Sequence, residues 1–319
     1  VWARAPLVVA AAGLGPALLR AGLPRREGVI LIGAEPAGPD IWALAQDVGA
    51  DHVVFLPAAA RWLVDRFAAC LDGEVTEAPL VAVLGGRGGA GASVLSAALA
   101  LAAARRGGRP VLVDADPLGG GLDLLMGGED AVGLRWPDLV TASGRLAADS
   151  TCAALPLVSG VRMLSWDRAD PIDLPAPAMI AVLRAARRGA DLVVADLPRC
   201  LAEPAVHALR QSHVALLVVP AEVRACAAAA RVAARATAHC SDLRVVVRGP
   251  APAGLPSRDV AAALGLRLEG ALRPEPGLAP ALDRGPLASR GGRGPLGQFC
   301  ANFLDRLADS QPAPNRRPA

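Results

Sequence analysis

The chain has 319 residues, 53% of them hydrophobic and 20% charged, so it can bury a large core in one large domain or two smaller ones. The formal net charge of +3 is small for this length, which argues against a dedicated nucleic-acid-binding protein with a clustered basic patch. All 33 basic residues are arginine. The six cysteines are scattered, so we interpret them as reduced buried thiols and not as a disulfide framework or a metal site.

Short apolar runs alternate with amphipathic stretches in residues 1–72, which predicts a small α/β domain of parallel β-α-β units. We expect strands at 7–11, 28–32 and 53–57, and helices over 39–48 and 58–71. The acidic and polar stretch 73–79 is predicted to be a linker. The N-terminus is apolar but is soon followed by charged residues, so we interpret it as part of this domain and not as a signal peptide.

A second alternating series runs from residue 80 to residue 310. Its continuous apolar strand runs predict a sheet covered on both faces by helices, that is, a three-layer α/β/α domain with a mostly parallel sheet. We expect strands at 80–84, 110–114, 161–165, 192–196, 214–219, 243–247 and 268–272, and helices over 93–106, 176–188, 202–211 and 223–239. The Pro- and Arg-rich tail, 311–319, is predicted to be disordered.

A glycine-rich loop follows the first strand of this second series. Five glycines lie within residues 85–91, and Ser93 opens the next helix. Glycines let backbone N–H groups wrap a phosphate, the helix N-terminus adds partial positive charge, and a serine hydroxyl at this place suits Mg²⁺. The pattern predicts a phosphate-binding loop, with a plain tight turn between strand and helix as the alternative.

Acidic residues close two later strands of the series. Asp114 and Asp116 follow one apolar run, and Asp196 follows another. Because the carboxyl ends of parallel strands lie at one edge of a sheet, these carboxylates are expected near the glycine-rich loop. The alternative is that each is a strand-terminal cap.

The loop resembles the deviant Walker A motif of MinD/ParA ATPases, K-G-G-x-G-K-[ST]. The frame is kept from residue 87 to residue 93, but both lysines are replaced. The resemblance implies a P-loop domain that binds ATP or ADP with Mg²⁺, with Asp116 positioning the attacking water and Ser93, Asp114 and Asp196 at the metal. It implies nucleotide contacts from Gly86, Arg87, Gly88, Gly89, Ala90, Gly91, Ala92 and Ser93.

The two lysine replacements differ in their consequences. Arg87 stands at the signature lysine, which in the family reaches the nucleotide of the dimer partner, and arginine can still offer a charged fork to phosphate. Ala92 stands at the loop lysine, which holds the β- and γ-phosphates, and a methyl group cannot do so. A charge-assisted hydrogen bond contributes roughly 1.5–3 kcal/mol, so we expect phosphate affinity to fall about tenfold or more.

The segments GLRWPDL (133–139) and MLSW (163–166) are similar to the actinobacterial CpaE-like group, which includes the septum site-determining protein Ssd and lies beside secretion and pilus-assembly genes. In that group the N-terminal unit resembles a response-regulator receiver. Here no acidic phosphoacceptor closes a central strand, so we predict a degenerate docking receiver. ParA-like proteins often read adenine with an Asn-Arg pair where this chain has Arg248 and Gly249, which leaves base specificity open.

Two functions remain open. One is a regulatory protein for septum placement or for localising secretion or pilus machinery; the other is an active ATPase that cycles between a monomer and a nucleotide-sandwich dimer. An enzyme of the nitrogenase-iron-protein type is disfavoured by the cysteine spacing. The resemblance implies a homodimer, with a secretion or pilus ATPase or divisome components as partners.

The chain is expected to be cytoplasmic, with recruitment to the pole or septum. The apolar helical spacing of residues 296–307 is predicted to dock this segment on the domain, because its polar face lacks the basic character of membrane-binding helices. Membrane contact would then be peripheral at most.

Overall fold

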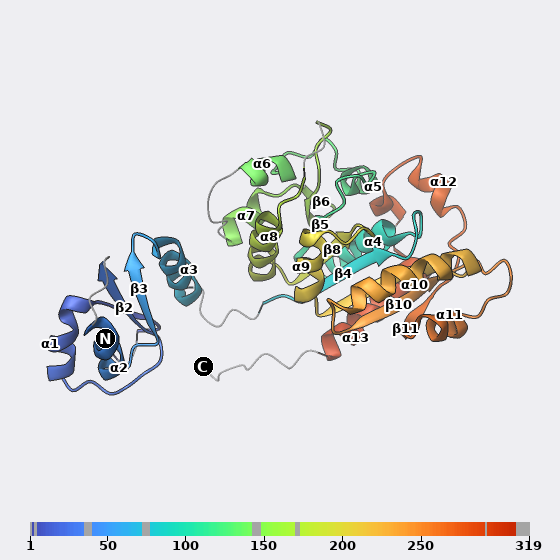
Figure 1. Cartoon of the computed structure of the whole chain (residues 1–319). Helices are drawn as coiled ribbons and strands as arrows, with labels where there is room; N and C mark the ends of the chain where they lie inside the picture. The colour runs from blue at the N-terminus through green and yellow to red at the C-terminus, as the bar shows by residue number, and fades with distance from the viewer. Residues whose placement is uncertain are drawn as a thin grey trace. The chain divides into compact units, whose positions relative to one another are not determined.

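The computed structural model describes residues 2, 5–34, 40–71, 77–141, 148–169, 173–290 and 292–310. The chain divides into two compact units, Val1–Val75 and Thr76–Ala319 (Figure 1). The tail predicted to be disordered, 311–319, lies outside the described residues. Among the helices of the described ranges, none has both the length and the apolar character needed to cross a membrane.

The first unit is a small parallel sheet with strand order β1-β2-β3. Neighbouring residues of β2 point to opposite faces, so Leu31 joins a cluster with Ile41 of α2, whereas Ile30 joins one with Leu63 of α3. Helices therefore cover both faces of this sheet. Its elements are β1 (Val8–Ala11), η1 (Ala12–Leu14), α1 (Gly15–Arg20), β2 (Val29–Ala34), α2 (Asp40–Val48), β3 (His52–Leu56) and α3 (Ala60–Leu71).

The second unit is built on an eight-stranded sheet with the order β11-β10-β9-β4-β8-β5-β7-β6. All neighbouring strands are parallel except β6 and β7, which pair antiparallel at one edge. The strands are β4 (Leu80–Gly85), β5 (Pro110–Asp114), β6 (Leu157–Val158), β7 (Val161–Leu164), β8 (Leu192–Leu197), β9 (Val214–Pro220), β10 (Leu243–Arg248) and β11 (Arg267–Leu272).

Helices cover both faces of this sheet and make it a three-layer structure (Figure 1). One face carries α4 and α13, and the other carries α8 to α11. The helices of the unit are α4 (Ala92–Arg105), α5 (Leu122–Met126), α6 (Trp136–Thr141), α7 (Ala148–Ala154), α8 (Ala176–Gly189), α9 (Glu203–Gln211), α10 (Val223–Thr237), α11 (Ser257–Leu264), α12 (Leu278–Leu282), η2 (Leu287–Arg290) and α13 (Pro295–Asp309).

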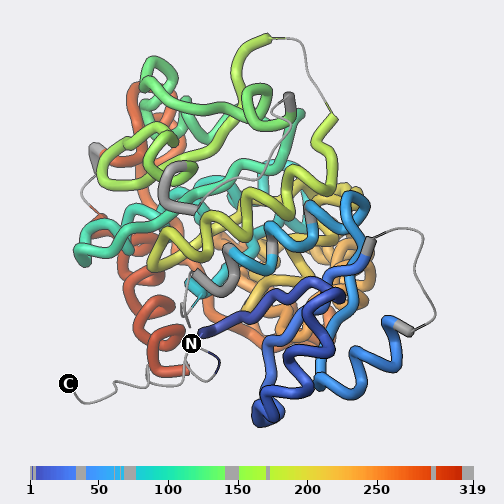
Figure 2. Tube along the Cα trace, turned by 90° about the vertical axis from the view of Figure 1, so that its left-hand side faces the viewer, coloured from blue at the N-terminus to red at the C-terminus, as the bar shows by residue number. Residues whose placement is uncertain are grey.

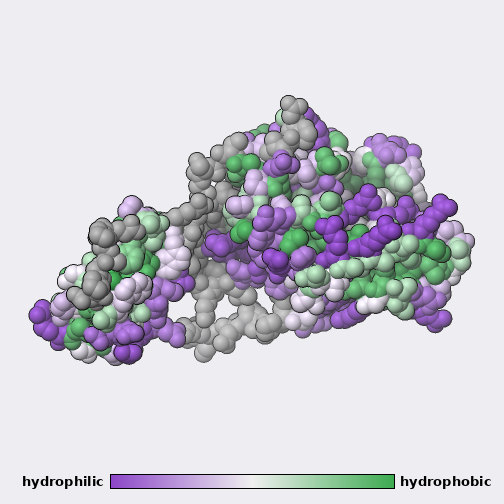
Figure 3. All heavy atoms as spheres, viewed as in Figure 1, coloured by the Kyte–Doolittle hydropathy of each residue, from purple (hydrophilic) through white to green (hydrophobic). Residues whose placement is uncertain are grey.

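The helix α10 shows how small residues set the spacing between a helix and the sheet. Ala225, Ala229 and Ala233 recur every four residues, are buried and face the strands. Alanine on the opposite side is exposed, and Figure 3 shows a pale green stripe along this helix beside a row of purple hydrophilic residues. Since the buried side chains are only methyl groups, α10 can approach the start of the glycine-rich loop closely.

The predicted fold class is confirmed: both units are α/β, and the larger one has a mostly parallel sheet. The residue pattern predicts neither β6 nor the short helices α5 to α7, because elements of two to seven residues carry too few positions to show a periodicity. Residues 77–79, assigned to the linker, contact α8: the N–H of Ala78 donates to the carbonyl of Arg187 at 2.7 Å.

The C-terminal helix docks on the domain as its apolar spacing predicts. Leu296, Cys300, Phe303 and Leu304 of α13 are buried in the same cluster as the core residues of α4 (red in Figure 2). Deep burial also raises the pKa of the Cys300 thiol to about 12, so this cysteine is a core residue and not a reactive thiol.

Candidate functional site

The glycine-rich loop joins β4 to α4 and lines a cavity of about 600 Å³. Gly89 and Gly91 have φ of 69° and 98°, a left-handed backbone that other residues rarely adopt. Gly86 is required for a different reason: a Cβ at this position would lie 2.6 Å from the Cβ of Ala229 on α10. A Cβ on Gly88 would meet open space. The loop therefore needs some glycines for its turn and one for packing, and keeps an open side toward the cavity.

Asp196 of β8 lies at the carboxyl end of the sheet and lines this cavity. The hydroxyl of Ser96 donates to its Oδ1 at 3.0 Å, and Ser93 forms a second hydrogen bond with it. Burial, followed by the charge of Asp114, raises the pKa of Asp196 to about 7, while the two serine hydroxyls oppose the shift. A cation near this carboxylate would favour its ionised form.

Asp114 closes β5 directly beside Asp196, with which it pairs in register. Its Oδ2 accepts hydrogen bonds from the N–H of Leu122 and from the hydroxyl of Ser165, both at 2.9 Å. Burial raises the pKa of Asp114 to about 6, although these hydrogen bonds lower it. The carboxylate of Asp114 thus accepts its hydrogen bonds from groups inside the fold, and Asp114 is not among the residues that line the cavity. Its metal role stays a prediction.

Two tryptophans support this strand end. Trp136 is fully buried, and its Nε1 donates to the backbone carbonyl of Asp114 at 2.6 Å. The rings of Trp136 and Trp166 lie 5.8 Å apart between centroids. The segments 133–139 and 163–166, distant in sequence, therefore meet at the end of β5, and the second of them also contributes Ser165.

Asp116 lines the cavity at the start of the turn after β5. Its Oδ1 accepts a hydrogen bond from the N–H of Leu118 at 3.1 Å, and its own N–H lies 3.3 Å from Oδ1 of Asp114. The structure thus brings Asp116, Asp196, Ser93 and the glycine-rich loop to one cavity, with Asp114 behind them. Whether Asp116 is catalytic stays a prediction.

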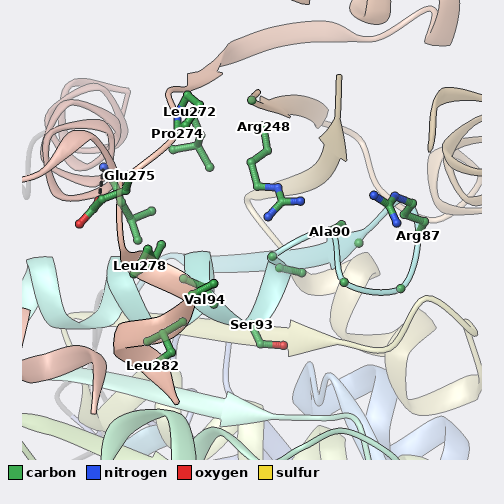
Figure 4. A pocket seen from close by; sticks show the side chains of 18 of the residues that line it. Arg87, Ala90, Ser93, Val94, Arg248, Leu272, Pro274, Glu275, Leu278 and Leu282 are labelled. Carbon is green, nitrogen blue, oxygen red and sulfur yellow. Dashed lines mark hydrogen bonds between the residues drawn. The ribbon is translucent and has the colours of Figure 1, made fainter. Parts of the chain in front are cut away.

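The side chain of Arg87 forms an ion pair within the same chain. Its Nη2 lies 3.0 and 3.1 Å from the two carboxylate oxygens of Glu222, the residue that precedes α10. In Figure 4 Arg87 and Ser93 stand at opposite ends of the loop. Ala92, at the place of the loop lysine in the resembled motif, contributes only a methyl group to the cavity lining.

Leucine and proline side chains form much of the far end of the cavity, which Arg273 also lines. Its wall is formed by Leu272, Pro274, Leu278 and Leu282, together with Val94 of α4 (Figure 4). The carboxylate of Glu275 also lines it but is engaged, since its Oε2 accepts a hydrogen bond from the N–H of Leu296 at 3.2 Å. No sequence pattern predicts this wall, because its residues come from a loop and short helices without a motif.

In the sequence, Arg248 stands out only as a departure from the adenine-reading pair of ParA-like proteins. In the structure it reaches over the loop: an ideal Cβ on Gly91 would lie 3.5 Å from its Cδ. The sequence offers a signal that could have found it, namely an arginine that ends a buried strand at the same sheet edge as the glycine-rich loop.

The arrangement fits a nucleoside phosphate. The loop offers backbone N–H groups and the N-terminus of α4 to a phosphate chain, and the apolar wall suits a base. Ser93 and Asp196 offer oxygen atoms to Mg²⁺, which usually takes few protein ligands and completes its shell with phosphate oxygens and water. In the described part of the chain, no group of three or more His, Cys, Asp or Glu is arranged to hold a metal ion.

Comparison with known proteins agrees with this architecture. Residues 1–79 match the family described as the Rv3660c-like, CheY-like N-terminal domain. The Mycobacterium tuberculosis proteins Rv3660c (strain ATCC 25618 / H37Rv) and MT3760 (strain CDC 1551 / Oshkosh) are each 43% identical over 292 residues, which is 91% of this chain and 82% of theirs.

Solved structures resemble the larger unit at low sequence identity. A ParA family ATPase from Chlorobium tepidum TLS has a TM-score of 0.65 at 14% identity, over 73% of this chain and 99% of its own. A chain of the MinC:MinD cell division protein complex from Aquifex aeolicus has a TM-score of 0.61 at 22% identity, over 76% of this chain and 100% of its own. MinD of Pyrococcus horikoshii OT3, solved with Mg-ADP, has 0.56 at 17%, over 72% and 97%. The chain belongs to the Rv3660c-like family, with a CheY-like N-terminal domain followed by an α/β domain of the MinD/ParA fold.

Proposed function

We propose that this protein is a regulatory member of the MinD/ParA fold that binds a nucleotide weakly through a degenerate Walker A loop and does not run an efficient ATPase cycle. The observation that carries the proposal is Ala92, a methyl group in a loop that otherwise keeps its glycines and its serine. The ion pair between Arg87 and Glu222 supports it, because it neutralises the other basic residue of the loop within the same chain.

The cellular role we propose is septum-site determination or localisation of secretion or pilus machinery, as in the CpaE-like group that includes Ssd. The CheY-like domain would act as a degenerate docking receiver, with boundaries at 1–72, a linker at 73–79 and the nucleotide domain at 80–310. Divisome components or a secretion or pilus ATPase would be the partners of a homodimer. The protein would act in the cytoplasm and be recruited from there to the pole or septum.

An active ATPase is the second candidate. It is favoured by the way Ser93, Asp116 and Asp196 line one cavity with the glycine-rich loop, since these are the residue types that bind Mg²⁺ and position water in phosphoryl transfer. The choice between the candidates depends on how much transition-state stabilisation remains without the loop lysine.

Steady-state ATP hydrolysis and ATP binding, measured with Mg²⁺ on the wild type and on Asp116→Ala, separate the two candidates. A regulator binds ATP and shows the same negligible turnover in both proteins. Asp130→Ala is the matched control, because Asp130 is exposed and does not line the cavity. Robust hydrolysis that disappears in Asp116→Ala but survives in Asp130→Ala would establish the active ATPase instead.

A further inference from the structure

Arg248 ends β10 and extends across the glycine-rich loop. An ideal Cβ on Gly91 would lie 3.5 Å from Cδ of Arg248 and 3.9 Å from its Nη1, and both residues line the same cavity. Figure 4 shows the guanidinium directed from its strand toward the loop. An arginine from a distant part of the sequence therefore stands over the backbone that would hold a phosphate.

The charge of Arg248 is not neutralised within the described residues. Its buried Nε has no hydrogen-bond acceptor there, and no described carboxylate forms an ion pair with it, whereas Arg87 pairs with Glu222. Arginine carries five N–H donors and stays charged, and burying the Nε–H without an acceptor costs free energy. A negatively charged ligand in the cavity would supply those acceptors.

We propose that Arg248 supplies, from β10, the cation that holds the phosphate chain in place of the lysine missing at Ala92, and that the site selects its ligand by the phosphate chain and not by the base. This inference rests on the proposed function, since it assumes that the cavity binds a nucleoside triphosphate. The chain contains no lysine, so a second cation over the loop must be an arginine. A guanidinium can donate hydrogen bonds to two phosphate oxygens at once.

The base end of the cavity supports the second half of the proposal. Leu272, Pro274 and Leu278 line this end with apolar side chains, beside Arg273, and the carboxylate of Glu275 accepts a hydrogen bond from the N–H of Leu296. An apolar wall discriminates weakly between two purines of similar size. We therefore expect ATP and GTP to bind with affinities that differ by less than about tenfold.

The test is calorimetric titration of the full chain, in the presence of Mg²⁺, with three probes: ATP, GTP and inorganic tripolyphosphate. The variants are Arg248→Gln and, as the matched control, Arg258→Gln, which removes the same charge from an exposed residue outside the cavity. We expect Arg248→Gln to weaken the binding of all three probes by about tenfold to a hundredfold. Arg258→Gln should change none of them by more than about twofold.

A rescue variant shows whether a loss of affinity in Arg248→Gln comes from the missing charge or from a loss of folding. Adding Ala92→Lys to Arg248→Gln should restore at least about tenfold of the lost affinity, because it returns a cation to the loop from its other side. Wild-type binding that is unchanged in Arg248→Gln would overturn the inference and leave the proposed function standing. Loss of GTP binding alone, with tripolyphosphate unaffected, would show that Arg248 reads the base. A wild type that binds none of the probes would overturn both proposals.

Discussion

Single glycines of the loop differ in what surrounds them. Gly86 faces the methyl groups of α10 and β9, whereas Gly88 faces open space. The composition of the loop does not distinguish Gly86 from Gly88, since each simply adds flexibility to a run of glycines. Their surroundings show that Gly86 is required for packing, whereas Gly88 leaves room for a ligand.

Gly86→Ala should destabilise the protein by about 1–3 kcal/mol, because its Cβ would lie 2.6 Å from the Cβ of Ala229 and 3.3 Å from the helix backbone at that residue. Gly88→Ala is the matched control and should change the free energy of unfolding by less than about 0.5 kcal/mol. Urea denaturation of both variants measures the difference. Equal losses would show that flexibility of the loop, and not contact with α10, explains the glycine at position 86.

Buried carboxylates give the site a pH dependence. Burial raises the pKa of Asp196 to about 7 from its ordinary value of 3.8, so the folded state binds a proton more tightly than the unfolded state. Stability from this group is therefore complete below about pH 4 and is lost as the pH rises through about 7.

Asp196→Asn should raise the free energy of unfolding by roughly 1–4 kcal/mol at pH 8.5 and should change it much less at pH 5, in nucleotide-free protein with Mg²⁺ removed by a chelator. Asp191→Asn should act in the opposite direction, because hydrogen bonds from Arg109 lower the pKa of Asp191, so its ionised form stabilises the fold. Thermal melts at both pH values check this. A lower free energy of unfolding in Asp196→Asn at pH 8.5 would contradict a raised pKa of Asp196 in the folded protein.

At the scale of elements, one buried carboxylate connects β10, β11 and α13. The side chain of Glu269 is only 1% exposed, and it forms ion pairs with Arg244 and Arg306. Its Oε2 accepts a hydrogen bond from Arg244 at 2.7 Å, and Arg306 binds its other oxygen. This network, together with the buried aromatic Phe303, attaches the C-terminal helix to the edge of the sheet.

Glu269→Gln should cost about 3 kcal/mol, because it leaves the mostly buried guanidinium of Arg244 without one of its two charged partners. Asp305→Asn removes a carboxylate of α13 itself, which forms an ion pair with Arg106, but Asp305 is 66% exposed, so the loss should stay below about 1 kcal/mol. Chemical denaturation compares the two variants. Similar small losses would show that α13 is held by its apolar face alone.

At the scale of the whole molecule, the chain has separate hydrophobic cores for its two units. Leu31 lies in a cluster of residues from the first unit only, and Leu112 lies in a cluster from the second. The two units differ greatly in the number of buried residues, so their intrinsic stabilities should differ as well.

We expect two unfolding transitions in a calorimetric scan. Leu31→Ala should lower the midpoint of one and Leu112→Ala that of the other, with a loss of about 2–5 kcal/mol in each affected unit. A single transition that moves in both variants would show that the units unfold cooperatively.

Much of the fold follows from local pattern. Each predicted strand of the second series has a counterpart in the sheet. Strands such as β4, β8 and β9 are buried throughout, and a strand buried on both faces must be apolar along its length, so that run is visible in the sequence. The glycine-rich loop and the acids at the ends of β5 and β8 could be placed at one edge because parallel strands bring their carboxyl ends together. The short edge strand β6 could not be predicted from two residues.

The sequence by itself determined the α/β class, the position of the glycine-rich loop and the absence of lysine from it, since these depend on residue type and order along the chain. Only the tertiary structure decided which side chains meet at the loop. It pairs Arg87 with Glu222, sets Asp114 beside Asp196 and brings Arg248 over Gly91. These contacts join residues 82 to 157 positions apart, and their geometry depends on strand order and register, which no local pattern encodes.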